Sequence, residues 1–515
     1  MSRPPSQRSY GEELSLVGVS ATARLAASVV SLLATVVTTS LVVRLLGTRD
    51  YGILAFLMSA VTLIPDIASL GFATAAARTL ADAESRANRE RLERTLRAGM
   101  TIALVSGAIG AVAMILLAQV LPRGLDGSTR LVAGASLGLM LFGINVSTMS
   151  ASMGRALGRV VASEVPSTIF AVARAAVVVA LTIAGVADIR AVVVGYAGAG
   201  VVAAIVGTSV VRSAFRSTVS ILRPSPAAAR ALAVFSVPFA VWALSHLVID
   251  RFDVLVLGIA RSSAAVGQYE PSMKITAQLT VIAPLLFGAQ FVPTATRLLA
   301  QGDRASFGDL FARITKLTFV AGMVPVILLA AFPETALRAL YGSEYPVRPG
   351  VIWVLLLGYT ATTAFAFNGL MLAAMADAAS LRWVGGIALV AMLLFAAVLV
   401  PAAGIMGAAI ATSASLLVLS LASGLRLRTV AGFGLLRRDH TIALASAVLP
   451  VAAGLAVRVS GPPDGLGLAA VWTFLFWGLW VALLFAVGTL RWGEIEPLLG
   501  VFRREPDPPR SNTGS

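Results

Sequence analysis

The sequence predicts an all-α protein that crosses a membrane many times. Its 515 residues are 58% hydrophobic and 13% charged, whereas about a quarter of the residues in a soluble protein are charged. The apolar residues form long unbroken runs, each able to form a helix across about 30 Å of hydrocarbon. A barrel of short alternating strands is excluded by these runs, because backbone groups in lipid must be hydrogen-bonded within each helix.

Fourteen apolar runs are predicted to span the membrane, and no connection between them is long enough for a further domain. The predicted spans are 16–46, 51–78, 97–121, 131–153, 160–184, 190–211, 231–258, 264–297, 314–338, 349–375, 382–401, 404–425, 441–458 and 466–490. We expect two parallel six-helix halves, 1–222 and 223–430, around a central cavity. Two more helices in 431–490 and a basic cytoplasmic tail at 491–515 would follow.

The basic residues alternate between the predicted loops in a way that supports this count. With the N-terminus inside, 27 Lys and Arg fall on the inner side and 11 on the outer side, as the positive-inside rule requires. The protein is therefore predicted to have both termini in the cytoplasm. The net charge of +15 is explained by this asymmetry and does not indicate nucleic acid. The chain contains no Cys, which excludes disulfides and thiolate metal sites.

Two short stretches about 200 residues apart have the same pattern. In Leu41–Gly52 (LVVRLLGTRDYG) and Leu255–Tyr269 (LVLGIARSSAAVGQY), an aliphatic run ends in Leu-Gly, a polar turn follows, and a Gly near a Tyr begins the next helix. Each is interpreted as a hairpin between two spans, one in each half. Because both would lie on the outer side, the halves are expected to be parallel repeats.

These hairpins resemble those of the oligosaccharide flippases of the multidrug/oligosaccharidyl-lipid/polysaccharide exporter superfamily. Their first hairpin often reads "aRLLGpedyG" and their seventh helix ends in "D-x-x-x-L-G", which is similar to Asp253–Gly258 here. Asp66–Arg78 and Val266–Ile275 match two further motifs in order. Glu270-Pro271 departs from the small residues usual in the last motif.

The resemblance implies a flippase that moves a polyprenyl-pyrophosphate-linked oligosaccharide across the bacterial cytoplasmic membrane by alternating access. The partners implied are the lipid-linked oligosaccharide, the bilayer and, in the same pathway, glycosyltransferases or a polymerase. No cofactor is expected.

Polar residues on the first span are candidates for binding the substrate. Arg24, Ser28, Ser31, Thr35 and Thr38 recur along one face of an otherwise apolar helix. The hydroxyl residues could instead pack against other helices. Arg24 lies about two turns from the inner end, so snorkelling to the interface is an alternative for it.

Two other cations are candidates for the same site. Arg174 lies well inside the fifth span, where a charge costs at least about 2.5 kcal/mol unless it faces water, an acid or a ligand. An ion pair with a buried acid is the alternative. Lys274 follows Glu270 by one turn, and such pairs near helix ends are often local and solvated.

Acidic residues are candidates for coupling or gating. Trp242, His246, Asp250 and Asp253 share one predicted face of the seventh span, although they could form an outer charge cluster balanced by Arg251. Glu270 is placed with these acids. So is Asp66, which has no charged neighbour in its span and needs a cationic partner.

The absence of catalytic motifs argues against an enzyme. The sequence contains no G-x-x-x-x-G-K-[ST] loop and no H-E-x-x-H motif, and it has only two His. A cation-coupled multidrug exporter of the same superfamily remains an alternative and would need a net acidic cavity. A membrane polysaccharide polymerase or ligase is a further alternative, but such enzymes usually carry a large outer loop.

Overall fold

The computed structural model describes residues 10–69, 80, 89–120, 125–157, 159–214, 226–279, 298, 301–375, 378–431, 438–461 and 463–494. Every regular element in these ranges is a helix. The prediction of an all-α membrane protein is therefore confirmed. The basic tail from 495 lies outside the described residues.

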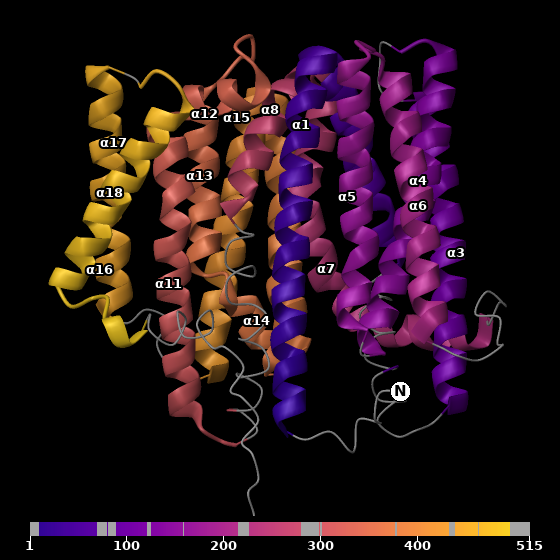
Figure 1. Ribbon diagram of the computed structural model, residues 1–515, viewed down its shortest axis with the longest axis horizontal. Helices are drawn as coiled ribbons and strands as arrows, with labels where there is room; N and C mark the ends of the chain where they lie inside the picture. The colour runs from indigo at the N-terminus through magenta and orange to yellow at the C-terminus, as the bar shows by residue number, and fades with distance from the viewer. Residues whose placement is uncertain are drawn as a thin grey trace, which may run out of the picture.

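The helices run roughly parallel to one another (Figure 1). In chain order they are α1 (Tyr10–Ser69), α3 (Arg89–Val120), α4 (Gly127–Ala156), α5 (Val160–Ile183), α6 (Ile189–Ala214), α7 (Pro226–Ala260), α8 (Ser263–Ala277), α11 (Arg304–Ala331), α12 (Pro333–Tyr341), α13 (Pro349–Ala364), α14 (Phe367–Ala374), α15 (Ala378–Ala431), α16 (Arg438–Ser446), α17 (Val448–Ser460) and α18 (Leu466–Ala486).

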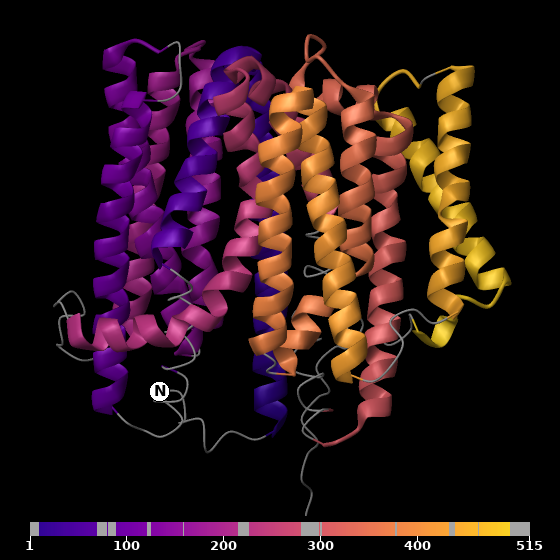
Figure 2. The same ribbon diagram turned by 180° about the vertical axis from the view of Figure 1, so that it is seen from behind.

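The helices separate into groups on either side of α1. Figures 1 and 2 show α3 to α6 together on one side, α11, α13 and α15 on the other, and α16 to α18 outermost. α7 packs mainly against α15, and also against α1 and α3. Both groups therefore meet along α1 and α7. The division of the chain at 222, 430 and 490 stays a prediction.

Within the described ranges, ten helical stretches are long and apolar enough to cross a membrane. Two of them, 26–63 and 379–430, each contain two limbs that meet at a glycine. The ten stretches thus hold twelve of the fourteen predicted spans, and α7 and α8 lie at the positions of the other two.

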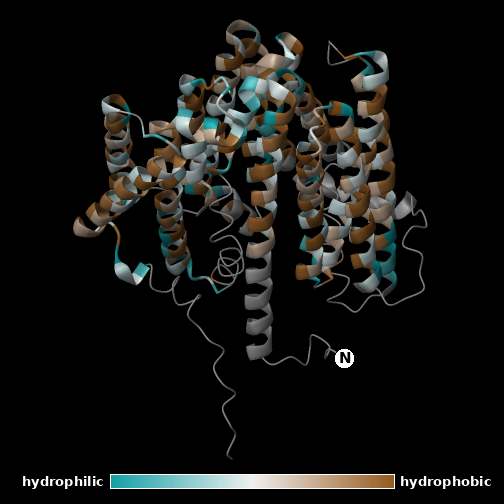
Figure 3. Cartoon of the chain, turned by 45° about the horizontal axis from the view of Figure 1, so that its top comes forward, coloured by the Kyte–Doolittle hydropathy of each residue, from teal (hydrophilic) through white to brown (hydrophobic). Residues whose placement is uncertain are grey.

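Hydrophobic residues cover the helices along most of their length (Figure 3). On α3 the side chains of Val105, Ile109, Val112 and Leu116 recur every three or four residues, and each is more than half exposed. An apolar stripe of this kind suits a helix face that contacts lipid.

Several predicted spans are broken in the structure. The span predicted at 314–338 begins ten residues earlier, as α11, and ends at Ala331, because Pro333 starts the separate helix α12 after Phe332. The predicted span 349–375 is divided into α13 and α14, and 441–458 into α16 and α17. Of the predicted span 264–297, residues 280–297 lie outside the described residues.

Two glycines allow sharp turns between helical limbs that follow each other directly. Gly47 has φ 71° and joins the two limbs of α1, and Gly404 has φ 58° and joins those of α15. Residues with a Cβ rarely adopt positive φ. Each glycine therefore lets one span end and the next begin with almost no loop.

The two predicted hairpins lie at the same end of the bundle and touch each other. A Cβ on Gly52 would lie 1.8 Å from the carbonyl oxygen of Ser263, and one on Gly267 would lie 1.7 Å from that of Thr48. The backbones of α1 and α8 are therefore in direct contact here. We call this the glycine contact, and the end of the bundle that carries it the hairpin end.

A buried lysine fastens the last helices to α11. Lys316 is 4% exposed, and its Nζ lies 2.8 Å from Oε2 of Glu494 and 2.7 Å from the carbonyl oxygen of Thr489. On α16, Nε2 of His440 lies 2.9 Å from the carbonyl oxygen of Ala312. These bonds fix both ends of the C-terminal segment against one helix.

Candidate functional site

Three cations from three helices lie close enough to interact with one another. They are Arg174 on α5, Arg251 on α7 and Lys274 on α8, and both arginines repel the Lys274 ammonium. Arg251 also repels Arg174. We call these three residues the cation cluster. It brings together two residues that the sequence predicted and one that it did not.

Among the described residues, the side chains that hold Arg174 are aromatic and not acidic. Its guanidinium carbon lies 4.5 Å from the ring centre of Phe170 and 5.5 Å from that of Tyr196 on α6, within the range of cation–π attraction. In the described part of the chain, its buried Nε has no hydrogen-bond partner, and no ion pair of Arg174 is found. The predicted alternative, a buried ion pair, is thus not observed there.

Lys274 forms the predicted pair with Glu270, but the pair is buried rather than solvated. Nζ lies 2.6 Å from Oε1 of Glu270, whose side chain is 1% exposed while that of Lys274 is 28% exposed. The Tyr51 hydroxyl on α1 donates to the other oxygen of Glu270. Each oxygen of the Glu270 carboxylate therefore has a partner, and Glu270 joins α1 to α8.

Asp250 and His246 on α7 have exposed side chains. Both side chains are surrounded by protein yet exposed, which indicates a water-accessible space beside α7. Among the described residues, the Asp250 carboxylate has no hydrogen bond or ion pair and senses Arg251 only through space. The Trp242 side chain lies outside the described part.

Asp253 is placed differently, although it was predicted to share the face of Asp250. Its side chain is fully buried and accepts hydrogen bonds from the Tyr269 hydroxyl (2.5 Å), the Thr412 hydroxyl (2.6 Å) and its neighbouring backbone N–H at Val254 (2.7 Å). These bonds tie α7 to α8 and α15. Asp253 therefore lies in a packed junction and not in the space beside Asp250.

The hydroxyls of the first span are partly satisfied within α1. Thr35 and Thr38 donate to the carbonyls four residues earlier, at 2.8 Å and 2.7 Å, and Thr38 is buried. Ser31 reaches Thr168 on α5 at 3.5 Å, and Ser28 is exposed. The side chains of Arg24 and Asp66 lie outside the described part, although both residues belong to α1.

An apolar groove lies along α13. It has a volume of about 640 Å³ and is enclosed by α11, α13, α16 and α17. Its lining includes Phe319, Met323, Leu357 and Leu455, and Thr360 is the one hydroxyl among the lining residues, none of which is charged. The groove therefore has the chemistry of a hydrocarbon-binding surface.

Sequence reasoning missed Arg251, the aromatic partners of Arg174, and the groove. Arg251 was assigned to balancing the acids, because helical periodicity alone placed it off the polar face. The sequence did contain a signal for Arg251, because a charged residue inside a predicted span indicates a functional site. Across the described chain, no group of three or more His, Asp or Glu side chains could hold a metal ion.

Comparison with known proteins supports a single family and fold. A family model described as "Polysaccharide biosynthesis protein" matches residues 20–299, more than half of the chain. No curated protein matches the chain in sequence.

Solved structures of transporters share the fold at low sequence identity. The lipid II flippase MurJ in an inward closed conformation superposes with a TM-score of 0.69 at 11% identity, over 89% of this chain and 98% of that one. An inward-facing multidrug resistance MATE family transporter gives a TM-score of 0.62 at 13% identity, over 78% and 94%. A transporter of the same superfamily from Pyrococcus furiosus, described as having a binding pocket of reverse polarity, gives 0.57 at 14%, over 81% and 95%.

Proposed function

The chain belongs to the polysaccharide biosynthesis protein family, and on that premise we propose that it is a flippase for a lipid-linked oligosaccharide. The substrate would be a glycan on a polyprenyl pyrophosphate in the bacterial cytoplasmic membrane. The N-terminus and C-terminus would lie in the cytoplasm and the hairpin end outside. The protein would bind and move this lipid without chemical change.

The observation that carries the proposal is the cation cluster, and within it the free donor of Arg174. A pyrophosphate is multiply charged and needs several cations, and a guanidinium can bind two of its oxygens at once. The Nε of Arg174 is buried without a partner among the described residues, which costs free energy until an acceptor arrives. Phe170 and Tyr196 hold the side chain ready.

Charge balance favours an anionic substrate over a cationic one. Glu270 is occupied by Lys274 and Tyr51, and Asp253 is buried in its own junction. Among the described residues, Asp250 is then the one exposed acid beside the cation cluster, and Arg174 and Arg251 are the two cations for which no ion pair is found. We propose Asp250, Asp253, Glu270 and Asp66 as residues that respond to substrate or gate the site.

The apolar groove would hold the polyprenyl chain while the pyrophosphate lies at the cation cluster. α13 contacts α8, the helix that carries Lys274. α13 also lines the groove. A flippase needs both environments, because the head group must cross while the chain stays in hydrocarbon. The contact between the hairpins would close the outer end, so that the substrate enters from the inside.

The test is flipping of a fluorescent polyprenyl-diphosphate oligosaccharide in proteoliposomes, measured as the fraction reached by an added glycosidase. Arg174→Gln should slow flipping about 10- to 150-fold, the equivalent of one charge-assisted hydrogen bond. Arg174→Lys should be intermediate, because an ammonium is only a point charge. Arg94→Gln alters an exposed pair and should leave the rate unchanged. Flipping at the wild-type rate by Arg174→Gln would contradict the proposal.

Arg24 is tested by the substitutions Arg24→Ala and Arg24→Lys, with membrane abundance measured in parallel. If it faces the cavity, Arg24→Ala should abolish export at normal abundance and Arg24→Lys should retain part of it. A snorkelling arginine would tolerate both changes. A structural ion pair would lower abundance in the Ala variant, and neutralising the partner acid would restore it.

Cation-coupled drug export is the second candidate, and the exposed Asp250 carboxylate is the observation that favours it. An exposed acid on α7 that has no hydrogen bond from any described residue could attract a cationic drug. Overexpression would then raise drug resistance, and Asp250→Asn would remove the resistance. Unchanged resistance on overexpression speaks against this candidate.

A further inference from the structure

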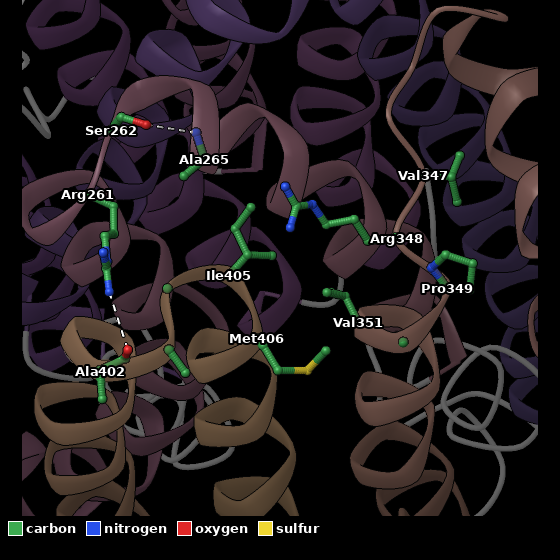
Figure 4. A pocket seen from close by; sticks show the side chains of 13 residues that line it. Arg261, Ser262, Ala265, Val347, Arg348, Pro349, Val351, Ala402, Ile405 and Met406 are labelled. Atoms are coloured by element: carbon green, nitrogen blue, oxygen red, sulfur yellow. Dashed lines mark hydrogen bonds between the residues drawn. The ribbon is translucent and has the colours of Figure 1, made fainter.

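A second binding site is suggested by an open pocket at the hairpin end. The pocket has a volume of about 790 Å³ and lies where the α7–α8 turn, the start of α13 and the turn in α15 meet. Figure 4 shows its lining, with Arg261 on one side and Arg348 extending toward it from the other. It is formed by different residues from the cation cluster and the apolar groove.

All the charge on the pocket lining is positive. Arg261 and Arg348 are its two charged residues, and no Asp or Glu is among the lining residues. Both arginines are exposed, so neither charge is buried against an acid. A pocket with this lining selects an anion.

Each guanidinium is oriented by a neutral acceptor. Nη2 of Arg261 donates to the carbonyl oxygen of Pro401 at 2.6 Å, and Nη2 of Arg348 donates to Oε1 of Gln268 at 3.0 Å. Gly404, whose φ is 58°, forms the turn in α15 beside the Arg261 guanidinium. An arginine has five N–H donors, and in the described chain no ion pair uses the remaining ones. The pocket therefore presents spare donors on two fixed side chains.

One edge of the pocket continues onto an apolar helix face. Met406 lines the pocket and begins a stripe on α15 with Ile410, Leu417 and Leu421, all exposed. The spacing of four, seven and four residues keeps these side chains on one face of the helix. A ligand in the pocket can thus have a charged part over the arginines and a hydrocarbon part along α15.

We propose that this pocket binds the phosphate head group of an anionic phospholipid, with its acyl chains along the Met406–Leu421 stripe. The placement in the outer leaflet rests on the proposed orientation, whereas binding itself does not. A free phosphate would satisfy the two arginines equally well but would gain nothing from the stripe. The continuous apolar face therefore favours the lipid as the source of the phosphate.

The test uses full-length protein in nanodiscs of phosphatidylcholine with added phosphatidylglycerol, and native mass spectrometry of the released protein. The wild type should retain one tightly bound phosphatidylglycerol. Arg348→Gln should weaken retention about fivefold and Arg261→Gln/Arg348→Gln about 30-fold, since each basic residue contributes about 1 kcal/mol at a lipid surface. Arg49→Gln is the matched control. Arg49 is exposed at the same end and does not line the pocket, so this variant should bind as the wild type does.

Several outcomes would overturn the proposal. Equal retention by the double variant and the wild type would remove the pocket as a lipid site. Equal retention of phosphatidylcholine and phosphatidylglycerol would remove the charge selectivity. Loss of the bound lipid on adding millimolar inorganic phosphate would assign the pocket to a soluble anion. If the double variant unfolds, the single variant Arg348→Gln provides the test. It keeps Arg261 and its hydrogen bond beside the turn at Gly404. No arm requires transport, so a failure here is distinct from a failure of the flippase proposal.

Discussion

The glycine contact predicts what should happen when α1 and α8 are wedged apart. In Gly52→Ala the new Cβ would lie 1.8 Å from the carbonyl oxygen of Ser263, whereas ordinary van der Waals contact begins at 3.4 Å. The helices must therefore separate by about 1.6 Å, the difference between these values. Because the obstacle is backbone, no side-chain rotation relieves it. Overpacking of this kind costs about 1–3 kcal/mol, which would shift the population away from the closed hairpin end about 5- to 150-fold.

The absence of Cys makes a distance measurement direct. Spin labels at Arg49→Cys on α1 and Glu344→Cys, both exposed at the hairpin end, report the distance by pulsed electron paramagnetic resonance. Glu344 lies in the turn between α12 and α13, which is tied to α8 because the Tyr345 hydroxyl donates to the carbonyl oxygen of Gln268 at 2.6 Å. With Gly52→Ala the mean distance should increase, and the short-distance population of the parent pair should fall. Gly198→Ala is the matched control. It is also a helical glycine, but a Cβ there meets nothing within 4 Å.

The result that refutes the reasoning is an unchanged distance distribution for Gly52→Ala. It would mean that the backbones are not in contact at the hairpin end in the membrane. Equal shifts for Gly52→Ala and Gly198→Ala would show a general effect of alanine and not a wedge. Gly267→Ala, which meets the Thr48 carbonyl at 1.7 Å, should reproduce the shift.

Three further predictions concern stability and topology. Lys316→Met should lower the free energy of unfolding in detergent by about 3–5 kcal/mol, because it leaves a partly buried carboxylate unpaired, whereas Arg94→Met, in an exposed pair, should change it by at most about 0.5 kcal/mol. Equal losses would show that the buried lysine has no special role. Hydrogen bonds, led by that from Ser128, hold the pKa of Asp126 below its usual range. The stability this contributes is complete above the unfolded-state pKa of about 4 and is lost as the pH falls toward the lowered value. The melting temperature of the wild type should therefore fall more on acidification than that of Asp126→Asn, and parallel curves would contradict this. Cysteines at positions 85 and 128 should label from opposite sides of the membrane in intact cells, and labelling of both from outside would overturn the predicted topology.

The fold could be predicted in detail because membrane spans are specified locally. Twenty apolar residues form a helix whatever their neighbours are, so the starts of α5, α6 and α18 agree with the predicted spans within a residue. The errors occur where a local break lies inside an apolar run. Phe332-Pro333 divides one predicted span, since hydropathy does not register where a proline starts a new helix.

The candidate site was less predictable, because it depends on which helices become neighbours. Periodicity placed Asp250 and Asp253 on one face, yet side chains three residues apart on a helix still differ in direction by about 60°. Asp253 thus reaches α15 through Thr412 while Asp250 faces solvent. For the same reason no pattern in α5 could indicate that Tyr196 of α6 would lie over Arg174.

The Asp253 junction has a mechanical consequence for the whole molecule. It joins α7 to α8 and α15 through Tyr269 and Thr412, and Arg261 adds a second attachment between the α7–α8 turn and α15. These three helices are therefore braced at two levels and should move as one rigid body. At the glycine contact α1 meets α8 backbone to backbone, and in the described chain Tyr51 alone carries the side-chain hydrogen bonds between these two helices. Deformation should then concentrate where α1 contacts α8. Helices α7, α8 and α15 would transmit this motion together as one rigid body.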